Sequence, residues 1–417
     1  MSVKKLKIHF IGIGGIGVSA LAKYYLKNGY QITGSDLVSS EITETLKKTE
    51  VKIFIGKHKT KNLSKDVDLV IYSPAVKKNN SELKEAKKLK IKSQSYPENL
   101  GELTKNYFTI AVSGTHGKST TTAMLGLLLT KAGLDPTVIV GTKVKEFGNS
   151  NCRVGKSKYL VIEACEHKES FLNYHPNIII ITNIEAEHLD YFKNFNNVLR
   201  VFKKFTKKLK KNGILITEKE YKNTEIAKKL KKILKVPGEY NISNALAALA
   251  TAQVLKIPDK ISFKSLSEFK GSWRRFEEKN LKINNLKFKI IFDYAHHPTE
   301  IKATLQAAKE KYPKKKIWCV FQPHQYQRTF YLFKDFVKTF KEASIDKLII
   351  TDIYDVAGRE EKKIKEKVNS KKLIKAIDKP QAIYLPKKKI QQYLKTNLKG
   401  GEVIIIMGAG DIYKILS

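Results

Sequence analysis

Short runs of aliphatic and β-branched residues alternate with helical patterns along the whole chain. This alternation predicts βαβ units and mainly parallel sheets, so we expect an α/β fold. The runs contain few polar residues, as is typical of strands that are buried between helices. The predicted buried strands are residues 7–11, 69–72, 108–112, 159–163, 178–182, 288–293, 317–321, 347–351 and 403–407.

The length of the chain indicates more than one domain. Its 417 residues exceed what a single hydrophobic core usually holds, which predicts two to four domains. A polar helix around residues 97–105 precedes a first boundary near Tyr107, and a second boundary falls near Lys270. No internal repeat or low-complexity linker is visible. The predicted domains are residues 1–107, 108–270 and 271–417.

The charge is strongly positive, with 79 basic and 40 acidic residues and a formal net charge of +39. Such a charge suggests a nucleic-acid partner. However, only six of the basic residues are Arg, the residue that proteins favour for reading guanine. We therefore interpret the lysines as solvated helix faces whose field favours anionic substrates, and we expect no specific nucleic-acid partner.

The cysteines and the N-terminus suggest the cellular compartment. Cys152, Cys165 and Cys319 form no CxxC pair, so neither a disulfide framework nor a zinc site is predicted. A glycine-rich turn stands where a signal peptide would have its apolar stretch, and no apolar run approaches 18 residues. We expect a soluble, cytoplasmic protein without membrane insertion. Nothing in the sequence indicates an oligomeric state.

A glycine-rich turn follows the first predicted strand and precedes a predicted helix at residues 18–28. Three of its glycines fit the pattern GxGxxG, which lets backbone N–H groups approach a phosphate at a helix N-terminus. Asp36 follows the next strand, where a dehydrogenase would hold a ribose. Because this motif describes a phosphate site and no reaction, both a nicotinamide-dependent oxidoreductase and another nucleotide-binding protein fit it. The glycines are Gly12, Gly14, Gly15 and Gly17.

A second phosphate-binding motif is the run AVSGTHGKSTTT at residues 111–122. It contains the GK[ST] core of a P-loop, in which Lys118 contacts the β- and γ-phosphates and Ser119 binds Mg²⁺. The usual first glycine is Val112, so the loop is short. We expect an ATP site rather than a simple glycine-rich turn. Its predicted residues are Gly114, Thr115, His116, Gly117, Lys118, Ser119 and Thr120.

Two phosphate sites in successive domains favour a kinase-like enzyme or a ligase with a nucleotide-linked substrate, because a dehydrogenase needs only one nucleotide. Nine motifs along the chain then resemble, in order, those of the Mur ligase family, which builds the peptide stem of the bacterial cell wall. They cover essentially the whole chain. The motifs are HFIGIGGIGVSALA, GSD, SGTHGKSTTTAML, TNIEAEHLDYF, GEYNISNALAALA, WRRFE, DYAHHPTEI, FQPHQYQRT and GAGDIY.

The resemblance implies a three-domain α/β fold. Its parts are an N-terminal Rossmann-like UDP-binding domain, a central P-loop ATPase-like parallel sheet and a C-terminal Rossmann-like domain for the amino acid. The first two motifs resemble the branch that joins L-alanine to UDP-N-acetylmuramate. In that reaction ATP phosphorylates the lactoyl carboxylate and the amine attacks the acyl phosphate. Both steps gather negative charge, so cations and positioning should carry catalysis.

The resemblance also implies roles for individual residues. The implied catalytic residues are Lys118, Glu163, His188, Arg275 and His297, with Mg²⁺ held by Ser119, Glu163 and His188. The implied adenine contacts are Asn241 and Asn244, with Asp293 at the ribose and Arg275 at the γ-phosphate. The implied sugar-nucleotide contacts are the four glycines of the first turn with Ser35 and Asp36. The implied amino-acid contacts are His324 and Arg328. By the residues alone, Asn244 fits a helix start equally well, and one of the two histidines before Pro298 is a candidate for a helix-start role.

Two departures from the family pattern affect specificity and the metal site. Residues 163–168 read EACEHK where the family usually has EADESD, so Glu163 and Glu166 remain but two aspartates do not. Gln325 stands where the family often has Arg, so glycine and L-serine remain alternative substrates. A recycling ligase that joins a murein peptide to the same sugar is the nearest alternative. A basic nucleic-acid-binding ATPase is a more distant one.

Overall fold

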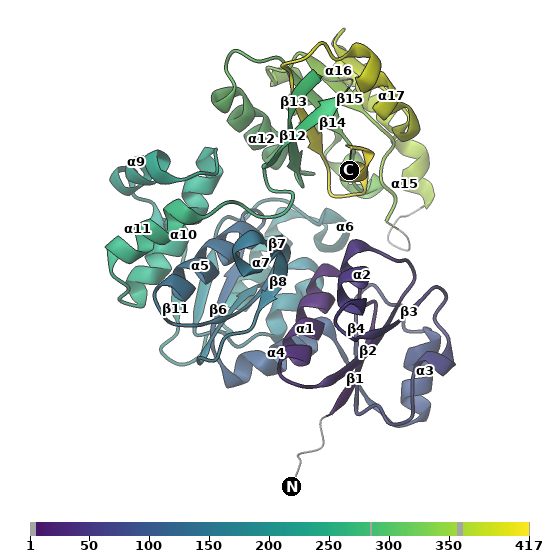
Figure 1. Cartoon of the computed structure of the whole chain (residues 1–417), viewed down its shortest axis with the longest axis vertical. Coiled ribbons are helices and arrows are strands. Elements are labelled where there is room, and N and C mark those ends of the chain that lie inside the picture. The colour runs from purple at the N-terminus through teal and green to yellow at the C-terminus, as the bar shows by residue number, and fades with distance from the viewer. Residues whose placement is uncertain (1–5, 284–285, 357–361, 417) are drawn as a thin grey trace. The chain divides into compact units, whose positions relative to one another are not determined.

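The computed structural model describes residues 6–283, 286–356 and 362–416. The described residues form three sheets with helices on their faces, which confirms the predicted α/β class (Figure 1). The chain folds into two compact units. Unit 1 comprises the part up to residue 185 with residues 198–226 and 244–269, and unit 2 comprises residues 186–197, 227–243 and 270 onwards.

The first sheet lies in unit 1 and is parallel throughout, in the order β3-β2-β1-β4-β5. The order reverses beside β1, so the turn after β1 lies at a topological switch point, where open α/β sheets bind ligands. The strands are β1 (Lys7–Ile11), β2 (Gln31–Asp36), β3 (Lys52–Ile55), β4 (Leu69–Tyr72) and β5 (Lys92–Ser95). The helices are α1 (Ile16–Lys27), α2 (Glu41–Lys47), η1 (Thr60–Asn62), α3 (Ser81–Lys88) and α4 (Tyr96–Asn106).

The second sheet also belongs to unit 1, in the order β11-β10-β6-β9-β7-β8, with only β8 antiparallel to its neighbour. Helix α5 (Lys118–Lys131) is buried along almost its whole length. The strands are β6 (Phe108–Ser113), β7 (Thr137–Val144), β8 (Ser150–Arg153), β9 (Tyr159–Glu163), β10 (Ile178–Ile181) and β11 (Ile214–Ile216). The helices that come between and after these strands along the chain are η2 (Lys145–Phe147), η3 (His167–Asn173), α6 (Leu189–Phe192), α7 (Phe195–Thr206), α8 (Glu218–Tyr221), α9 (Thr224–Ile233), α10 (Glu239–Val254) and α11 (Asp259–Glu268). Of these, α6 and most of α9 belong to unit 2.

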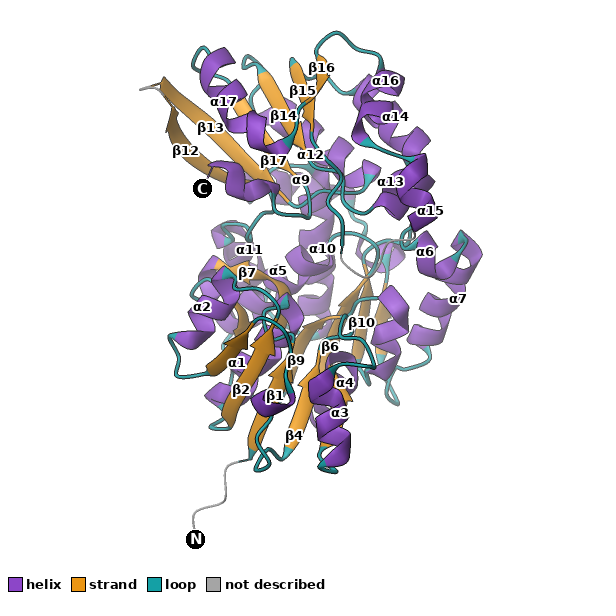
Figure 2. Cartoon of the chain, turned by 90° about the vertical axis from the view of Figure 1, so that its right-hand side faces the viewer, coloured by secondary structure: helices purple, strands orange, loops and turns teal. Residues whose placement is uncertain are grey.

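The third sheet forms the core of unit 2, in the order β12-β13-β17-β14-β15-β16, with β12 antiparallel to β13 (Figure 2). Side chains alternate across it, so that Ile405 packs under α12, α14 and α16 while Ile404 and Ile406 pack under α17. The strands are β12 (Glu277–Ile283), β13 (Leu286–Asp293), β14 (Ile317–Phe321), β15 (Lys347–Ile350), β16 (Ala382–Tyr384) and β17 (Val403–Met407). The helices are α12 (Pro298–Lys311), α13 (Tyr326–Tyr331), α14 (Phe333–Glu342), α15 (Lys362–Lys367), α16 (Ser370–Ile377), α17 (Lys387–Asn397) and η4 (Ile412–Leu416).

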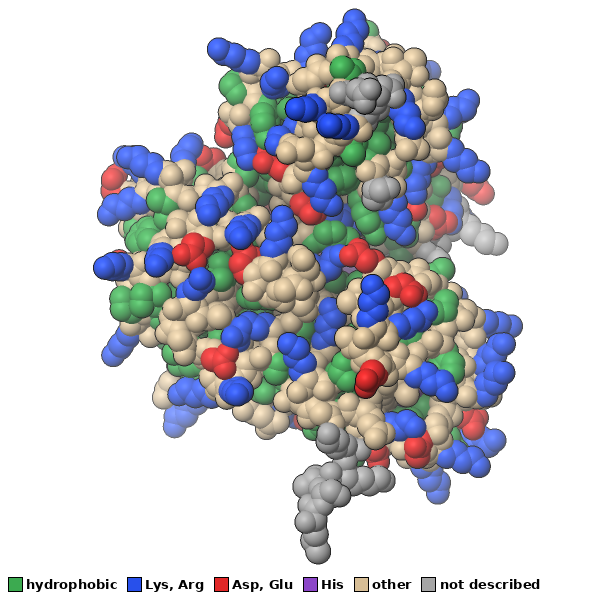
Figure 3. All heavy atoms as spheres, in the orientation of Figure 1, with side chains coloured by type: hydrophobic (Ala, Val, Ile, Leu, Met, Phe, Trp, Pro, Cys, Tyr) green, Lys and Arg blue, Asp and Glu red, His purple; other side chains and the backbone are tan. Residues whose placement is uncertain are grey.

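The visible surface carries side chains of both charges. Lysine and arginine side chains are interspersed with acidic ones over the face shown in Figure 3. This distribution agrees with solvated lysine-rich faces. Among the described residues, no helix is both long and apolar enough to span a membrane.

Within unit 1, a buried asparagine joins the first two sheets. Helix α1 packs against β7 and β8, and Asn151 of β8 is only 1% exposed. Its Nδ2 donates to Ile16 O at 2.5 Å and to Ser19 Oγ at 2.9 Å, and its Oδ1 accepts from Lys23 Nζ at 2.7 Å. These bonds fix the first turn of α1, which directly follows the glycine-rich turn.

Replacing Asn151 with Leu should therefore destabilise unit 1. The change keeps the number and branching of the side-chain heavy atoms but leaves the buried groups that Asn151 binds without their partner. We expect the free energy of unfolding to fall by about 1–3 kcal/mol, measured by denaturant unfolding followed by circular dichroism. Asn397→Leu is the control, because Asn397 is exposed and its side chain donates to Tyr393 O within its own helix. Equal midpoints for the two variants would contradict the anchoring role.

Candidate functional site

The glycine-rich turn of unit 1 is shaped by Asp36 and by close packing. Gly14 N donates to Asp36 Oδ2 at 2.8 Å, so this carboxylate holds the turn. Gly12 has a φ of +77°, which side chains rarely tolerate. A Cβ on Gly17 would lie 2.9 Å from Tyr96 Cζ. Because Gly15 is the N-cap of α1, no side chain covers the first N–H groups of the helix, which suits an anion.

Ser35 acts inside the protein rather than at its surface. Its side chain is fully buried, and its hydroxyl donates to Glu82 Oε2 at 2.6 Å. Its carbonyl accepts from Gly12 N at 2.8 Å. These contacts give Ser35 a role in holding the turn, and its predicted contact with the substrate stays a prediction. Sequence reasoning missed Glu82, because it lies 47 residues away on α3.

Glu82 is ionised although it is buried. Burial alone would raise the pKa of Glu82, but hydrogen bonds with His9, Ser35 and Asn62 hold it at about 2. The His9 Nε2–Glu82 Oε2 distance is 3.3 Å, and Asn62 Nδ2 donates to Glu82 Oε1 at 2.6 Å. This network fixes the carboxyl end of β2, from which Asp36 reaches the turn.

The P-loop lysine is held by its own loop and by one carboxylate. Lys118 Nζ donates to Gly114 O at 2.6 Å and to Thr115 O at 2.9 Å, and lies 3.1 Å from Glu166 Oε2. Burial would lower the pKa of Lys118, but Glu166, with Cys165 and Glu163, raises it above its ordinary value. Lys118 is therefore positively charged over the whole useful pH range.

Two of the three predicted metal-binding residues meet beside this lysine. Ser119 Oγ donates to Glu163 Oε2 at 2.8 Å, and Gly141 N donates to the same oxygen at 2.8 Å. A hydroxyl and a carboxylate oxygen are ligands that suit Mg²⁺, so these residues fit the predicted ion. The third, His188, belongs to unit 2.

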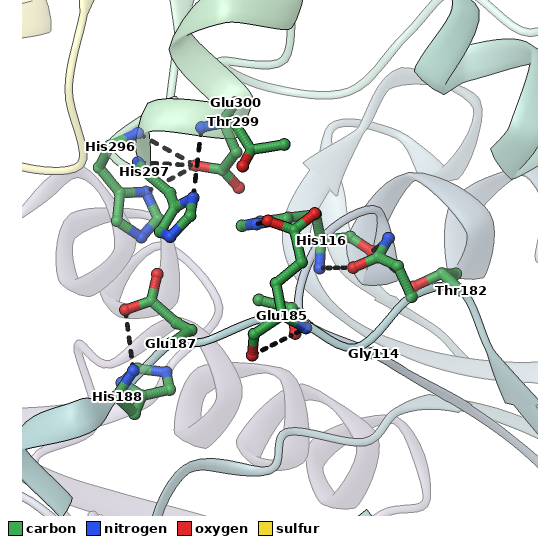
Figure 4. A network of polar contacts seen from close by, with 12 residues as sticks. Gly114, His116, Thr182, Glu185, Glu187, His188, His296, His297, Thr299 and Glu300 are labelled. Atoms are coloured by element: carbon green, nitrogen blue, oxygen red, sulfur yellow. Dashed lines mark hydrogen bonds and ion pairs between the residues drawn. The ribbon is translucent and has the colours of Figure 1, made fainter. Parts of the chain in front are cut away.

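The segment after β10 makes hydrogen bonds to the P-loop (Figure 4). Thr182 Oγ1 donates to His116 O at 2.5 Å, and His116 N donates to Asn183 Oδ1 at 2.9 Å. A Cβ on Gly114 would overlap Thr182 Oγ1, and Gly114 has a φ of +132°. The sequence motif around His188 thus contributes Thr182 and Asn183 as well, a role that sequence reasoning did not identify.

The two predicted adenine-contacting residues have different surroundings. Asn244 lies against the P-loop in unit 1, where its Oδ1 accepts from Thr121 Oγ1 at 3.2 Å and would be overlapped by a Cβ on Gly117. Asn241 lies in unit 2 and donates to Pro237 O at 2.7 Å. Asn241 therefore also serves the start of α10. Neither asparagine has the simple N-cap role that the residues alone would allow for Asn244.

In unit 2, Asp293 ends β13 and is enclosed by backbone donors. Phe276 N donates to its Oδ2 at 2.8 Å and Ala295 N to its Oδ1 at 2.7 Å. Burial raises the pKa of Asp293 to about 6, although Arg275 and the two N–H groups oppose the shift. Arg275 lies over the Tyr294 ring, 4.9 Å from its centroid. A titratable carboxyl and a cation thus lie together at this strand end.

The two adjacent arginines differ. Arg274 is 4% exposed, stacks on Tyr413 at 4.3 Å and donates to the carbonyls of Gly408 and Gly410. It connects the WRRFE and GAGDIY motifs structurally. Arg275 is the more accessible of the two, with its side chain 29% exposed, and its Nη1 lies 3.9 Å from Glu300 Oε1.

The two histidines before α12 also differ from each other in their hydrogen bonds. His297 is the N-cap, and its Nδ1 accepts from Thr299 N at 3.3 Å while Glu300 completes a capping box. The helix-start alternative thus holds for His297. His296 Nδ1 donates to Tyr294 O at 3.0 Å, which leaves Nε2 as the acceptor nitrogen. Burial lowers the pKa of His296 to about 4, so the ring is neutral near pH 7.

The predicted amino-acid residues form one cluster in unit 2. Arg328 Nη1 donates to His324 Nδ1 at 3.0 Å, and the His324 ring stacks on Tyr354 with centroids 5.5 Å apart. Arg328 Nε donates to Glu187 Oε1 at 3.0 Å. Sequence reasoning missed Glu187, although it directly precedes His188 in a motif that was singled out.

Comparison with known families decides the affiliation of the chain. Residues 7–108 match the model of the Mur ligase family catalytic domain, residues 112–235 the Mur ligase middle domain, and residues 274–410 the Mur ligase glutamate ligase domain. The chain belongs to the Mur ligase family. The three matches follow one another along the chain in the order of the three sheets.

This Mur ligase resembles one branch of the family over nearly its whole length. It is 42% identical to the UDP-N-acetylmuramate–L-alanine ligase of Acetivibrio thermocellus, covering 98% of this chain and 94% of the relative. It is 41% identical to that of Clostridium kluyveri, covering 99% and 97%. The structure of the UDP-N-acetylmuramate–alanine ligase of Thermotoga maritima aligns with a TM-score of 0.80 and 29% identity over 98% and 97% of the two chains. A murein peptide ligase of Psychrobacter arcticus shares the fold, with a TM-score of 0.71 and 22% identity over 98% and 97%.

The P-loop geometry of this Mur ligase predicts that Gly114→Ala is strongly destabilising. The new Cβ would overlap Thr182 Oγ1 at a φ of +132°. We expect a loss of about 1–3 kcal/mol from the backbone conformation and a further loss from the overlap. The measurement is denaturant unfolding together with hydrogen exchange of residues 114–118.

Gly133→Ala is a matched control for this prediction. Gly133 has a φ of +78°, but a Cβ there would have nothing within 4 Å. It should show only the conformational cost. If the two variants lose the same stability, the contact with Thr182 is unimportant.

Proposed function

We propose that this Mur ligase joins L-alanine to the lactoyl carboxylate of UDP-N-acetylmuramate, with hydrolysis of ATP to ADP and phosphate, in cytoplasmic peptidoglycan precursor synthesis. The observation that carries the proposal is the meeting of Lys118, Ser119 and Glu163 in a P-loop, within a chain that is similar over nearly its whole length to ligases of that name. All three family models are of Mur ligases, so we do not retain the oxidoreductase or the nucleic-acid ATPase.

The proposed division of labour follows the predicted domains. Residues 1–107 bind the UDP sugar, residues 108–270 bind ATP, and residues 271–417 bind the amino acid. In the first domain the pyrophosphate lies at the N-terminus of α1, where the glycines leave N–H groups uncovered. Asp36 and Ser35 hold this turn in shape from within.

In the ATP site, backbone N–H groups of residues 114–120 cradle the phosphates and Lys118 neutralises their charge. Mg²⁺, when bound, would supply positive charge that stabilises the negative charge of the phosphates. Ser119 and Glu163 would hold it, since their oxygens already lie 2.8 Å apart, and His188 would complete the set. Asn241 and Asn244 contact the adenine.

The C-terminal residues act on the other parts of ATP. Asp293 accepts from the ribose hydroxyls, and Arg275 contacts the γ-phosphate.

The lactoyl carboxylate oxygen attacks the γ-phosphorus, ADP leaves, and an acyl phosphate results. The amine nitrogen then attacks the carbonyl carbon, phosphate leaves, and the amine gives up a proton. His297 is a predicted catalytic residue; since its Nδ1 caps α12, Nε2 would be the nitrogen that acts.

The amino acid is proposed to bind at His324 and Arg328, whose guanidinium suits a carboxylate. Gln325 stands where the family often has a second Arg. It lies at the N-cap of α13 with a φ of +72° and is buried. Glycine and L-serine therefore remain candidates beside L-alanine, and a murein peptide remains the alternative of the recycling ligase.

The deciding experiment measures phosphate release from ATP with UDP-N-acetylmuramate and each of L-alanine, glycine, L-serine and a murein tripeptide. We expect release that requires both the sugar and L-alanine. Lys118→Met should lower the rate by at least about 100-fold, because it removes the cation at the phosphates. Lys131→Met is the control, since Lys131 lies at the far end of the same helix in an exposed ion pair with Glu268. Release with the tripeptide alone would support the recycling ligase, and folded protein without sugar-dependent release would refute both.

The pKa of Asp293 predicts a pH dependence of ATP use. The carboxyl pKa of Asp293 in the folded protein, about 6, lies above the ordinary value of 3.8, so folding favours the protonated form. Asp293 therefore contributes to the stability of the folded state at low pH, and this contribution is lost as pH rises through 6. Ribose binding needs the ionised form. Between pH 7 and pH 5 the ionised fraction falls roughly tenfold, and kcat/KM for ATP should fall with it.

Two variants test this pH dependence. Asp293→Asn should have a low kcat/KM for ATP at every pH and lack the transition near pH 6. Asp335→Asn, at an exposed carboxylate of α14, should keep the wild-type profile. A wild-type profile for ATP that is flat from pH 5 to pH 7 would contradict the assignment of Asp293.

A further inference from the structure

Glu187 and Arg328 form a buried ion pair in unit 2. Glu187 is 7% exposed and Arg328 is 8% exposed, and the Nε–Oε1 distance is 3.0 Å. Burial would raise the pKa of Glu187, but Arg328 and three nearby histidines hold it well below its usual range. Taking two charges out of water is costly and is offset only by well-aligned partners. Such a pair therefore fixes a particular orientation of both side chains.

Glu187 is itself held by the neighbouring backbone. The same Oε1 accepts from His188 N at 3.0 Å (Figure 4). His188 has a φ of +55° and is the N-cap of α6, a conformation that costs of order 1–3 kcal/mol. Since α6 packs against α13, which carries Arg328, one carboxylate oxygen connects the two elements.

The remaining contacts of Arg328 show which part of the guanidinium stays open. Nη1 donates to His324 Nδ1 at 3.0 Å and to His324 O at 3.1 Å. Nε is occupied by Glu187. Nη2, by contrast, makes no hydrogen bond to any residue in the described ranges. Three of the five N–H donors of an arginine are thus committed to the protein, and the two on Nη2 are presented.

We propose that Glu187 is a positioning residue for the amino-acid substrate: it orients Arg328 so that Nη2 faces the substrate carboxylate. This inference rests on the proposed function. It bears on specificity because Arg328 is the only arginine in the FQPHQYQRT segment, where Gln325 has replaced a second one. With one guanidinium instead of two, recognition depends on where that group points.

Two conservative substitutions separate position from charge. Glu187→Asp keeps the negative charge but withdraws it by one methylene, so Arg328 loses its alignment. We expect KM for L-alanine to rise roughly 10- to 100-fold, as for other misplacements of about 1 Å. Glu187→Gln loses the charge, which should lower the stability of the fold because Arg328 stays buried without a counter-charge. It keeps an acceptor oxygen in place, so in the folded protein KM for L-alanine should rise by no more than about threefold, since a neutral hydrogen bond is weaker than a charged one.

The measurement is steady-state phosphate release at varied L-alanine, with saturating ATP, Mg²⁺ and UDP-N-acetylmuramate. KM for ATP and for the sugar should stay within about twofold in both variants, because neither ligand uses Arg328. L-alaninamide lacks the carboxylate, so its inhibition constant should be the same in wild type and Glu187→Asp. Glu342→Gln, in an exposed ion pair with Lys302 on the same unit, is the control and should change nothing.

The outcomes are distinguishable. An unchanged KM for L-alanine in Glu187→Asp, or a larger rise in Glu187→Gln than in Glu187→Asp, would overturn the positioning role. A change in the Mg²⁺ requirement alone would mean that Glu187 serves His188 instead. If wild-type protein shows no sugar-dependent phosphate release at all, the proposed function fails, and this happens independently of any variant.

Discussion

The need to pair every buried charge governs the candidate sites in both units. Lys118 is held by Glu166, Arg328 by Glu187, and Glu82 by His9, Ser35 and Asn62. A charge removed from water without such a partner would be neutralised or would destabilise the fold. The groups proposed to bind anionic substrates are therefore also parts of the structure. Their orientation is set before any ligand arrives, which is the condition for efficient electrostatic catalysis.

Parallel sheets bring these pairs to the right places. Glu163 ends β9, Asp293 ends β13, and the P-loop begins where β6 ends. The carboxyl ends of neighbouring parallel strands lie along one edge of a sheet, so loops that are distant in sequence meet there. Ser119 and Glu163 meet in this way across 44 residues. The close approach of the loops leaves no room for side chains at Gly114 and Gly117.

The sequence predicted the buried strands well because they are continuous apolar runs. The predictions 69–72, 159–163, 317–321 and 403–407 agree with β4, β9, β14 and β17 residue by residue. The edge strands β5 and β8 were missed, since they read KSQS and SNCR, with no apolar pattern to reveal them. The interior strand β7, which reads TVIVGTKV, was missed as well. Motifs located the P-loop and the Ser119–Glu163 pair. They named Glu166 without its role as the partner of Lys118, and they did not identify Glu82 or Glu187. A charged partner is chosen by three-dimensional proximity, and Glu187 lies 141 residues from Arg328. The domain boundaries near residues 107 and 270 stay predictions.

The contact between Lys118 and Glu166 has a consequence for selectivity among anions. An incoming anion must displace a carboxylate that already occupies the ammonium group at 3.1 Å. Inorganic phosphate or sulfate would only replace the Glu166 carboxylate as the anionic partner of Lys118, so it would gain little binding free energy. Under the proposed ATP binding, a chelated triphosphate would engage the loop N–H groups and the Ser119–Glu163 pair at the same time, and would gain several contacts in that exchange. The internal carboxylate would then act as a competitor that disfavours small anions such as phosphate and sulfate.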